Sequence, residues 1–231
     1  MRTLLAAAAL LLGGSVAEAA DFVPLARRDD AIIMVGDIAH GDAEKLQREL
    51  NTRSAARIAT KYLLLNSMGG YVEPAYDIAR LVHNNGLVTV VDGGAYCVSA
   101  CMMVFAGGIE RWWWDGAFLG VHNASEGEND SAAWTVELAK VYGKMGVPPS
   151  IIVKMVSTPS SEIAWLTNDD VAGWANEALP QEAANPQVSM AAELQPQPRM
   201  TEIAAASAKR AERRFCKMHG EAYPERCAEF R

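Results

Sequence analysis

The sequence predicts an α/β domain in which most of the strands pair in parallel. Short apolar runs alternate along the chain with longer segments whose apolar residues recur at helical spacing. This alternation is typical of a parallel sheet covered by helices on both faces, which explains why the runs are continuously apolar. Half of the 231 residues are hydrophobic, which is enough for one globular domain with its own core.

Four segments have the character of strands. They cover residues 31–38, 61–67, 87–92 and 116–122. The first is rich in β-branched residues and ends at Gly36-Asp37, whereas the others are short apolar runs. Three consecutive tryptophans, Trp112-Trp113-Trp114, precede the last strand. Alternate side chains of a strand face opposite ways, so at least one indole is expected to be exposed, at a rim of the domain or at a contact with a subunit, a peptide or a membrane.

Six segments have helical spacing or helix-start signals. They cover residues 41–51, 68–86, 97–106, 130–146, 148–157 and 167–176. Asp42 is suited to cap the first helix, and Pro148-Pro149 is suited to begin the fifth. In the second helix, the face expected to be apolar carries Val72, Tyr76, Ala79 and Val82.

Residues 1–19 are predicted to be a signal peptide. A basic residue precedes an apolar run that is too short to span a bilayer, and the triplet Ala17-Glu18-Ala19 has small residues at the two positions that signal peptidase requires. The mature chain is therefore expected to begin at Ala20 and to be exported from a bacterial cytoplasm, into the periplasm or out of the cell. No other stretch of the sequence is long and apolar enough for a membrane-spanning helix.

Three further units are expected after this leader. Residues 20–181 form the α/β domain, residues 182–199 a linker that bears Pro and Gln, and residues 200–231 a basic helical extension. The whole chain has a net charge of −7, which argues against a nucleic-acid partner. The basic end could dock on the acidic domain, contact an acidic neighbour or make a peripheral contact with anionic lipid.

The four cysteines form two close pairs, which allow three disulfide connectivities in an exported chain. Cys216 and Cys227 close a short loop and are the favoured bridge. Cys97 and Cys101 stand four residues apart in an expected helix and are predicted to be two small reduced core residues, with a bridge between them as the alternative. No metal-ligand spacing and no GxxxxGK[ST] motif occurs, so no metal and no cofactor are expected.

Three stretches that follow or end predicted strands carry groups suited to acyl transfer. Ser99 lies near the start of its helix, where unpaired backbone N–H groups could stabilise a developing anion. Gly69-Gly70 forms another strand-to-helix turn, where glycine lets the backbone approach a substrate closely. His122 ends a strand, and its neutral imidazole could accept the serine proton. Each residue alone could equally be structural, and only together do they favour a nucleophile with its base.

These stretches resemble the Clp protease proteolytic subunit family. The residues "NSMGG" (66–70) are similar to its "NSPGG" turn, "GAYCVSACMMVFAGG" (94–108) to its nucleophile segment, and "RWWWDGAFLGVHN" (111–123) to the strand that ends in its catalytic histidine. The similarity is greatest to exported Clp-like proteins of bacteria, whose nucleophile region carries a Cys-x-Ser-Ala-Cys pattern, and it covers residues 30–180. The resemblance implies a crotonase-type fold, a superhelix of ββα units, and it suggests a homo-oligomer.

The same resemblance implies a serine peptidase. Ser99 would be the nucleophile, His122 the base, and the backbone N–H groups of Gly70 and Ala100 the oxyanion donors, with Gly69 also at the substrate. The acid of the triad is displaced, because the family's aspartate register falls on Ile163. Glu162, one residue away, is the predicted replacement. Loss of the third member of a triad typically costs on the order of 10⁴ in rate without abolishing catalysis.

The favoured function is therefore an exported serine peptidase that cleaves peptides or proteins. An extended peptide would pair with a strand edge near Gly69-Gly70. The displaced acid leaves a second hypothesis open, a non-catalytic Clp-like binding or assembly protein of the cell envelope. A third, acyl-CoA chemistry as in other crotonase-fold enzymes, is disfavoured because CoA is cytoplasmic and because Ser99 and His122 would have no role in it.

Overall fold

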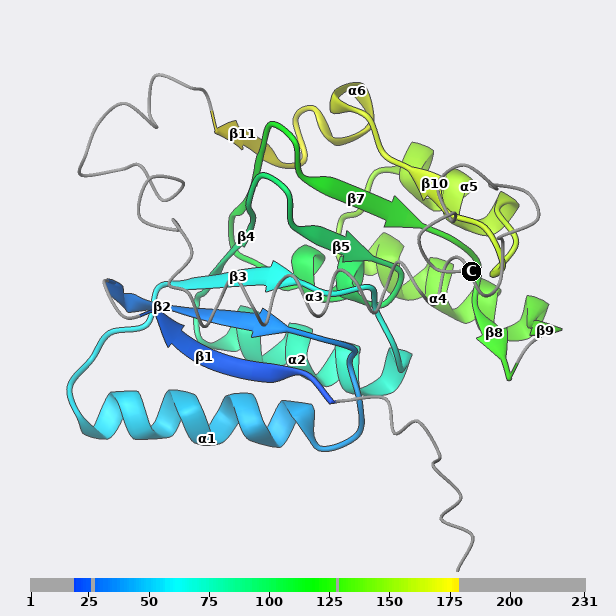
Figure 1. Ribbon diagram of the computed structural model, residues 1–231. Coiled ribbons are helices and arrows are strands. Elements are labelled where there is room, and N and C mark those ends of the chain that lie inside the picture. Colours follow the sequence, from blue (N-terminus) through cyan, green and yellow to red (C-terminus); the bar gives the residue numbers. More distant parts are fainter. Residues whose placement is uncertain (1–18, 26–27, 128, 179–231) are drawn as a thin grey trace, which may run out of the picture.

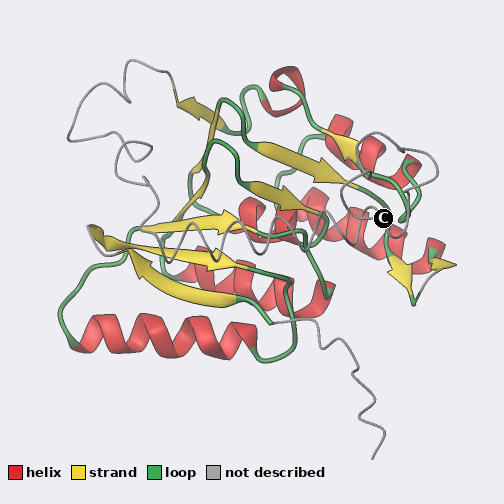
Figure 2. Cartoon of the chain, in the orientation of Figure 1, coloured by secondary structure: helices red, strands yellow, loops and turns green. Residues whose placement is uncertain are grey.

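The computed structural model describes residues 19–25, 28–127 and 129–178 and has a mixed α/β fold (Figure 1). The strands are β1 (Asp21–Leu25), β2 (Arg28–Val35), β3 (Tyr62–Asn66), β4 (Val88–Val91), β5 (Tyr96–Val98), β6 (Arg111–Trp114), β7 (Phe118–Val121), β8 (Ser125–Glu126), β9 (Asn129–Asp130), β10 (Ala164–Trp165) and β11 (Asn176–Ala178). The helices are α1 (Asp42–Ala55), α2 (Val72–Asn84), α3 (Cys101–Gly107), α4 (Ala132–Lys144), α5 (Pro149–Ser157) and α6 (Asn168–Val171). Strands and helices alternate through the first half of the domain, as the sequence predicts (Figure 2).

A six-stranded sheet forms the centre of the fold. Its strand order is β1-β2-β3-β4-β6-β11, in which β1 is antiparallel to β2 and every other pair of neighbours is parallel. In Figure 1, α1 lies below β1, and α2 runs behind β1 and β2. The larger buried cluster includes apolar residues of both helices, and a smaller one around Leu64 and Val90 lies on the opposite face. The predicted parallel α/β fold is confirmed.

A second sheet of three strands carries the candidate site. Its order is β10-β7-β5, with β5 parallel and β10 antiparallel to β7. A bridge joins β5 to the end of β3, because the Ser67 N–H donates to the Tyr96 carbonyl (2.7 Å) and the Val98 N–H donates to the Ser67 carbonyl (3.1 Å). The turn that follows β3 is thereby held against the turn that follows β5.

The segment around Ser99 differs from the helix predicted over residues 97–106. Tyr96–Val98 form β5, and α3 begins only at Cys101. Between them Ser99 has a φ of 55°, in the left-handed region that neither strands nor right-handed helices use. Hydrophobic pattern could not reveal this break, because the residues on both sides of it are apolar and almost all of them are buried.

Two details of the predicted helices are also wrong. Gly41, with a φ of 90°, precedes α1, so Asp42 is the first residue of the helix and not its cap. Val72 and Tyr76 are 39% and 42% exposed, so the buried face of α2 is rotated from the one predicted. The buried residues of α2 are Pro74, Ala75, Ile78, Ala79 and Val82.

The three tryptophans belong to β6 and serve the core. Trp113 and Trp114 are buried in different apolar clusters, and Trp112 is half-buried with its indole N–H donating to the Glu110 carboxylate (3.1 Å). The expectation of an exposed indole is therefore wrong. Both faces of β6 are covered, because Trp113 packs in the larger apolar cluster and Trp114 in the smaller one, while β11, a strand absent from the prediction, pairs in parallel with β6 at the edge of the sheet.

Several predictions concern residues outside the described ranges. They are the signal peptide up to residue 18, the linker 182–199, the extension 200–231 and the bridge between Cys216 and Cys227. All of them stay predictions. Within residues 19–25, 28–127 and 129–178, no helix is both long enough and apolar enough to cross a membrane.

Candidate active site

Ser99 stands at a sharp strand-to-helix turn between β5 and α3. A left-handed conformation costs a residue with a side chain on the order of 1–3 kcal/mol, so the surroundings must impose it. Three hydrogen bonds do so. The Ser99 N–H donates to the Gly120 carbonyl on β7 (2.9 Å), and the Ser99 carbonyl accepts from the Met102 N–H (2.9 Å) and from the buried Tyr142 hydroxyl (3.4 Å).

A disulfide between Cys97 and Cys101 closes over this turn. The prediction that the two cysteines stay reduced is therefore wrong. The helical spacing on which it rested does not exist, because Cys97 ends up in β5 while Cys101 begins α3. The two Cα atoms are 5.1 Å apart, within the range that a disulfide bridges, and both side chains are completely buried. The bridge ties the strand before Ser99 to the helix after it.

The Gly69-Gly70 turn lies directly against Ser99. A Cβ on Gly69 would lie 2.7 Å from the Val98 carbonyl oxygen and 2.8 Å from the Ser99 Cβ, so no larger residue fits. Gly70 has a φ of 140°, and a Cβ there would collide with the Ile38 carbonyl. Ile38 in turn donates its N–H to the Gly69 carbonyl (2.7 Å), so the turn is held from both sides.

Two backbone N–H groups at this junction have no hydrogen-bond acceptor among the described residues. They belong to Gly70 and Ala100, the two positions that the resemblance assigns to the oxyanion. The neighbouring donors are occupied, since Gly69 donates to the Ser67 hydroxyl (3.1 Å) and Ser99 donates to β7. The Ala100 nitrogen lies 3.0 Å from the Cβ position of Gly69, which brings both turns together. Free N–H groups beside a serine are what an oxyanion requires.

His122 follows directly after β7, two residues from the carbonyl that binds the Ser99 N–H. Its Nδ1 lies 2.7 Å from the carbonyl oxygen of Asn123. A carbonyl only accepts hydrogen bonds, so Nδ1 carries the proton and Nε2 is left with a free lone pair. Burial lowers the pKa of His122 below its ordinary value of 6.5, while the Asn123 carbonyl and the charge of Asp130 oppose this shift. The imidazole is therefore neutral at pH 7 and able to accept a proton.

Glu162 lies in the exposed turn before β10. Its N–H donates to the Pro159 carbonyl (2.9 Å), and within the described ranges its carboxylate forms no ion pair or hydrogen bond with His122. The pairing of β10 with β7 places Ala164 opposite Val121, which puts the preceding residue, Ile163, at the level of His122. An apolar side chain thus occupies the position that the family gives to its acid. The role of Glu162 stays a prediction.

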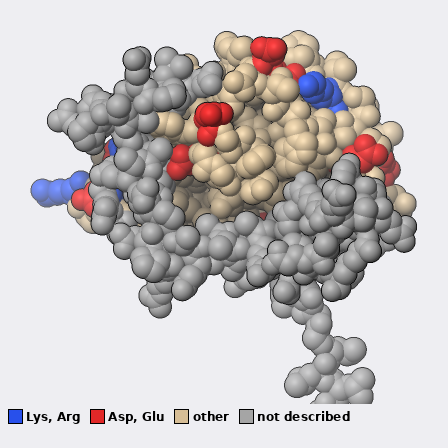
Figure 3. All heavy atoms as spheres, turned by 45° about the horizontal axis from the view of Figure 1, so that its top comes forward, with Lys and Arg blue, Asp and Glu red and all other residues tan. Residues whose placement is uncertain are grey.

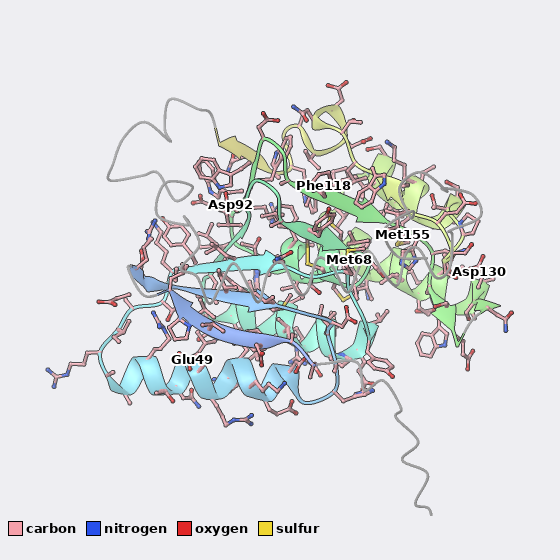
Figure 4. All side chains as sticks on the ribbon, in the orientation of Figure 1. Glu49, Met68, Asp92, Phe118, Asp130 and Met155 are labelled. Carbon is pink, nitrogen blue, oxygen red and sulfur yellow. A yellow bond between two sulfur atoms is a disulfide. The ribbon has the colours of Figure 1, made fainter. Side chains whose placement is uncertain are left out.

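Asp130 is the carboxylate whose charge acts on His122, and the sequence analysis missed it. It lies on the β8–β9 hairpin beyond the end of β7 (Figure 4). Its pKa is lowered by hydrogen bonds from the Ser160 hydroxyl and N–H, then by the Asn123 side chain and by His122 itself. In the sequence, the only sign of a link to His122 is that Asp130 follows it by eight residues. The sequence analysis interpreted Asp130 as the start of a helix.

An aromatic surface extends along β7 toward His122. Tyr96, Phe118 and Trp165 come from three neighbouring strands, with ring centroids 4.7 Å apart for Tyr96 and Phe118 and 6.1 Å apart for Phe118 and Trp165. Phe118 and Trp165 are half-exposed. His122 stands four positions after Phe118 along β7 and its continuation, so the side chains of Phe118 and His122 face the same way. Figure 3 shows that the described surface turned forward carries few charged side chains. Such a surface is suited to apolar side chains of a ligand.

Comparison with solved structures shows the fold of this chain. ClpP1 from Listeria monocytogenes superposes with a TM-score of 0.51 at 17% sequence identity, over 65% of this chain and 91% of that one. A mutant of the 1510-N membrane-bound stomatin-specific protease superposes with a TM-score of 0.50 at 12% identity, over 67% and 81% of the two chains. The chain has a Clp-protease-like fold. No protein-family profile and no curated protein sequence matches it.

Proposed function

We propose that this protein is an exported serine peptidase in which Ser99 attacks the peptide bond. The observation that carries the proposal is the turn at Ser99, which is held in a left-handed conformation against Gly69-Gly70 beside two unpaired N–H groups. Strained backbone of this kind is frequent at active sites, and here it stands beside groups that could serve acyl transfer. The Clp-protease-like fold supports the proposal.

In this mechanism the Ser99 Oγ adds to the carbonyl carbon of the substrate while its proton moves to Nε2 of His122. The negative charge that forms on the carbonyl oxygen is stabilised by the N–H groups of Gly70 and Ala100. The C–N bond then breaks, and His122 gives its proton to the departing amine. Water repeats the sequence on the acyl-serine ester, which releases the acid and restores the Ser99 hydroxyl.

In this proposal the Asn123 carbonyl orients the His122 ring. The carbonyl accepts the Nδ1 proton and so selects the tautomer that leaves Nε2 free. A neutral carbonyl stabilises the imidazolium of the transition state less than a carboxylate does, and the nearby charge of Asp130 compensates in part. We therefore expect slower turnover than in an enzyme with a complete triad.

Peptides with apolar side chains are the proposed substrates. The extended chain would run along the edge near Gly69-Gly70, with its side chains against the surface of Tyr96, Phe118 and Trp165. Export follows from the proposed signal peptide, and an active homo-oligomer is proposed from the resemblance. In an exported setting, ATP would not be available to a partner that unfolds substrates.

The alternative function is a non-catalytic binding or assembly protein with the same fold. The observation that favours it is Ile163, an apolar residue at the level of His122 where the family has its acid. In that protein the free N–H groups and the aromatic surface would hold a peptide without cleaving it.

Covalent labelling with a fluorophosphonate separates the two functions. The purified mature protein should be labelled, Ser99→Ala should not be, and His122→Ala should be labelled at least about 100-fold more slowly. Ser54→Ala, at an exposed serine on α1, is the matched control and should behave as the wild type. Absence of labelling in a folded and fully assembled wild type would make the binding protein the better interpretation.

A further inference from the structure

Asp42 is a completely buried carboxylate at the first turn of α1, far along the chain from Ser99. Its Oδ2 accepts hydrogen bonds from the Ala39 N–H (2.7 Å) and from the Ala20 N–H (3.0 Å). Lys45 Nζ lies 2.8 Å from Oδ1, yet that oxygen has no hydrogen-bond donor with suitable geometry within the described ranges. The carboxylate is thus paired with Lys45, but its Oδ1 still has room for a hydrogen-bond donor.

Both backbone groups of Ala20 form hydrogen bonds. Besides the bond from its N–H to Asp42, its carbonyl accepts from Lys45 Nζ (3.1 Å), and its side chain is completely buried. Ala20 is also the first residue after Ala17-Glu18-Ala19, the proposed signal-peptidase site. The backbone nitrogen of Ala20 that Asp42 binds is thus the nitrogen that cleavage would release.

We propose that Asp42 is a binding site for the α-ammonium group of the mature N-terminus. Hydrolysis of the Ala19–Ala20 bond adds water across the peptide, leaves the carboxylate on the leader and leaves a primary amine on Ala20. This amine takes up a proton at neutral pH because its ordinary pKa is about 8. It then offers three donors where the peptide offered one, and it adds a second cation to a carboxylate that Lys45 alone pairs in the precursor.

A short stretch of backbone connects the proposed ion pair between Asp42 and the ammonium group to the candidate active site. Asp42 Oδ2 accepts a hydrogen bond from the Ala39 N–H, and the preceding residue, Ile38, bridges to the Gly69-Gly70 turn. Removal of the leader would therefore tighten the same loop that positions the Gly70 N–H. This consequence rests on the proposed peptidase function, whereas the ion pair itself does not.

Chemical labelling of the α-amine tests the ion pair. The full chain is exported from a bacterium, its N-terminus is determined by mass spectrometry, and it is treated with 2-pyridinecarboxaldehyde, which modifies free α-amines. We expect an N-terminus at Ala20 that reacts at least about tenfold more slowly in the folded protein than in urea. A different N-terminus, or equal rates in the two states, would overturn the proposal.

Variants separate the ion pair from mere burial of the N-terminus. Asp42→Asn keeps an acceptor oxygen but no charge, and it should expose the amine to the reagent and lower Tm. Asp77→Asn, at a half-exposed carboxylate on α2, is the control and should change neither. One glycine added before Ala20 displaces the ammonium by about 3.5 Å and should act like Asp42→Asn even though Asp42 is intact. If the added glycine leaves both the rate and Tm unchanged, Asp42 does not bind the ammonium.

Fluorophosphonate labelling of the glycine-extended chain is the separate second measurement. A reduced rate there, with wild-type labelling in Asp77→Asn, would connect the N-terminus to the oxyanion turn. If the mature wild type is protected at its amine but is never labelled by fluorophosphonate, the peptidase proposal fails and the ion pair stands.

Discussion

The turn at Ser99 is fixed by many more buried interactions than the segments around His122. Ser99 lies between a buried disulfide, two glycines that admit no side chain, and hydrogen bonds to β7 and α4. Around His122, by contrast, both carboxylates are exposed: Glu162 in a turn and Asp130 on a short hairpin. The proposed nucleophile and the proposed oxyanion donors are preorganised by the core, whereas His122, the proposed base, depends on the carbonyl of its neighbour Asn123 and on a charge at the surface. Substitutions on the two sides should therefore have effects of different size and kind.

The largest effect is expected from Gly70→Ala. The new Cβ would collide with the Ile38 carbonyl, and alanine would also be strained at a φ of 140°, so we expect a loss of about 2–4 kcal/mol in the free energy of unfolding. Urea denaturation measures this loss, and fluorophosphonate labelling should fall with it. Gly86→Ala is the matched control, since Gly86 also has a positive φ (64°) but nothing within 4 Å of its Cβ position, and it should cost about 1 kcal/mol. Equal losses in both variants would mean that the packing between Gly70 and Ile38 is unimportant.

The sequence predicted those parts of the site that belong to short contiguous motifs. Ser99, the two glycines and His122 each follow or end an apolar run, so the alternation of strands and helices already placed them at neighbouring turns. The position of Asp130 could not be found in this way, because its hairpin is short, polar and exposed and has no periodicity. The strands β10 and β11 were missed because two and three residues are too few to show a period.

The disulfide shows a second limit of sequence reasoning. Four-residue spacing favours a helix, in which Cys97 and Cys101 would share one face. The structure instead has Cys97 in β5, the left-handed turn at Ser99 and Cys101 at the start of α3, and this arrangement brings the two cysteines within bonding distance. Apolar neighbours on either side gave no sign of it, because burial is the same for strand and helix there.

A smaller but still clear effect is expected when this bridge is removed. The double variant Cys97→Ala/Cys101→Ala should lose about 2 kcal/mol in the free energy of unfolding, the value for a loop this short, and its labelling rate should fall because the Ser99 turn is loosened. Thermal unfolding and labelling are measured side by side. Cys216→Ala/Cys227→Ala is the control for general loss of thiols and should be labelled at the wild-type rate. Unchanged labelling in the first double variant would show that the glycines and hydrogen bonds hold Ser99 without the disulfide.

The smallest expected effect is a shift in the pH dependence of the labelling rate, caused by substitutions near His122. The base works in its neutral form, and burial lowers its pKa, so the labelling rate should rise with pH around a midpoint below 6.5. Asp130 raises that pKa, so Asp130→Asn should move the midpoint to still lower pH, with little change in stability since the carboxylate is exposed. Glu162→Gln should leave the midpoint in place, because its carboxylate makes no interaction with His122 among the described residues. The reverse pattern, a midpoint that moves in Glu162→Gln and stays in Asp130→Asn, would make Glu162 the residue that acts on the base.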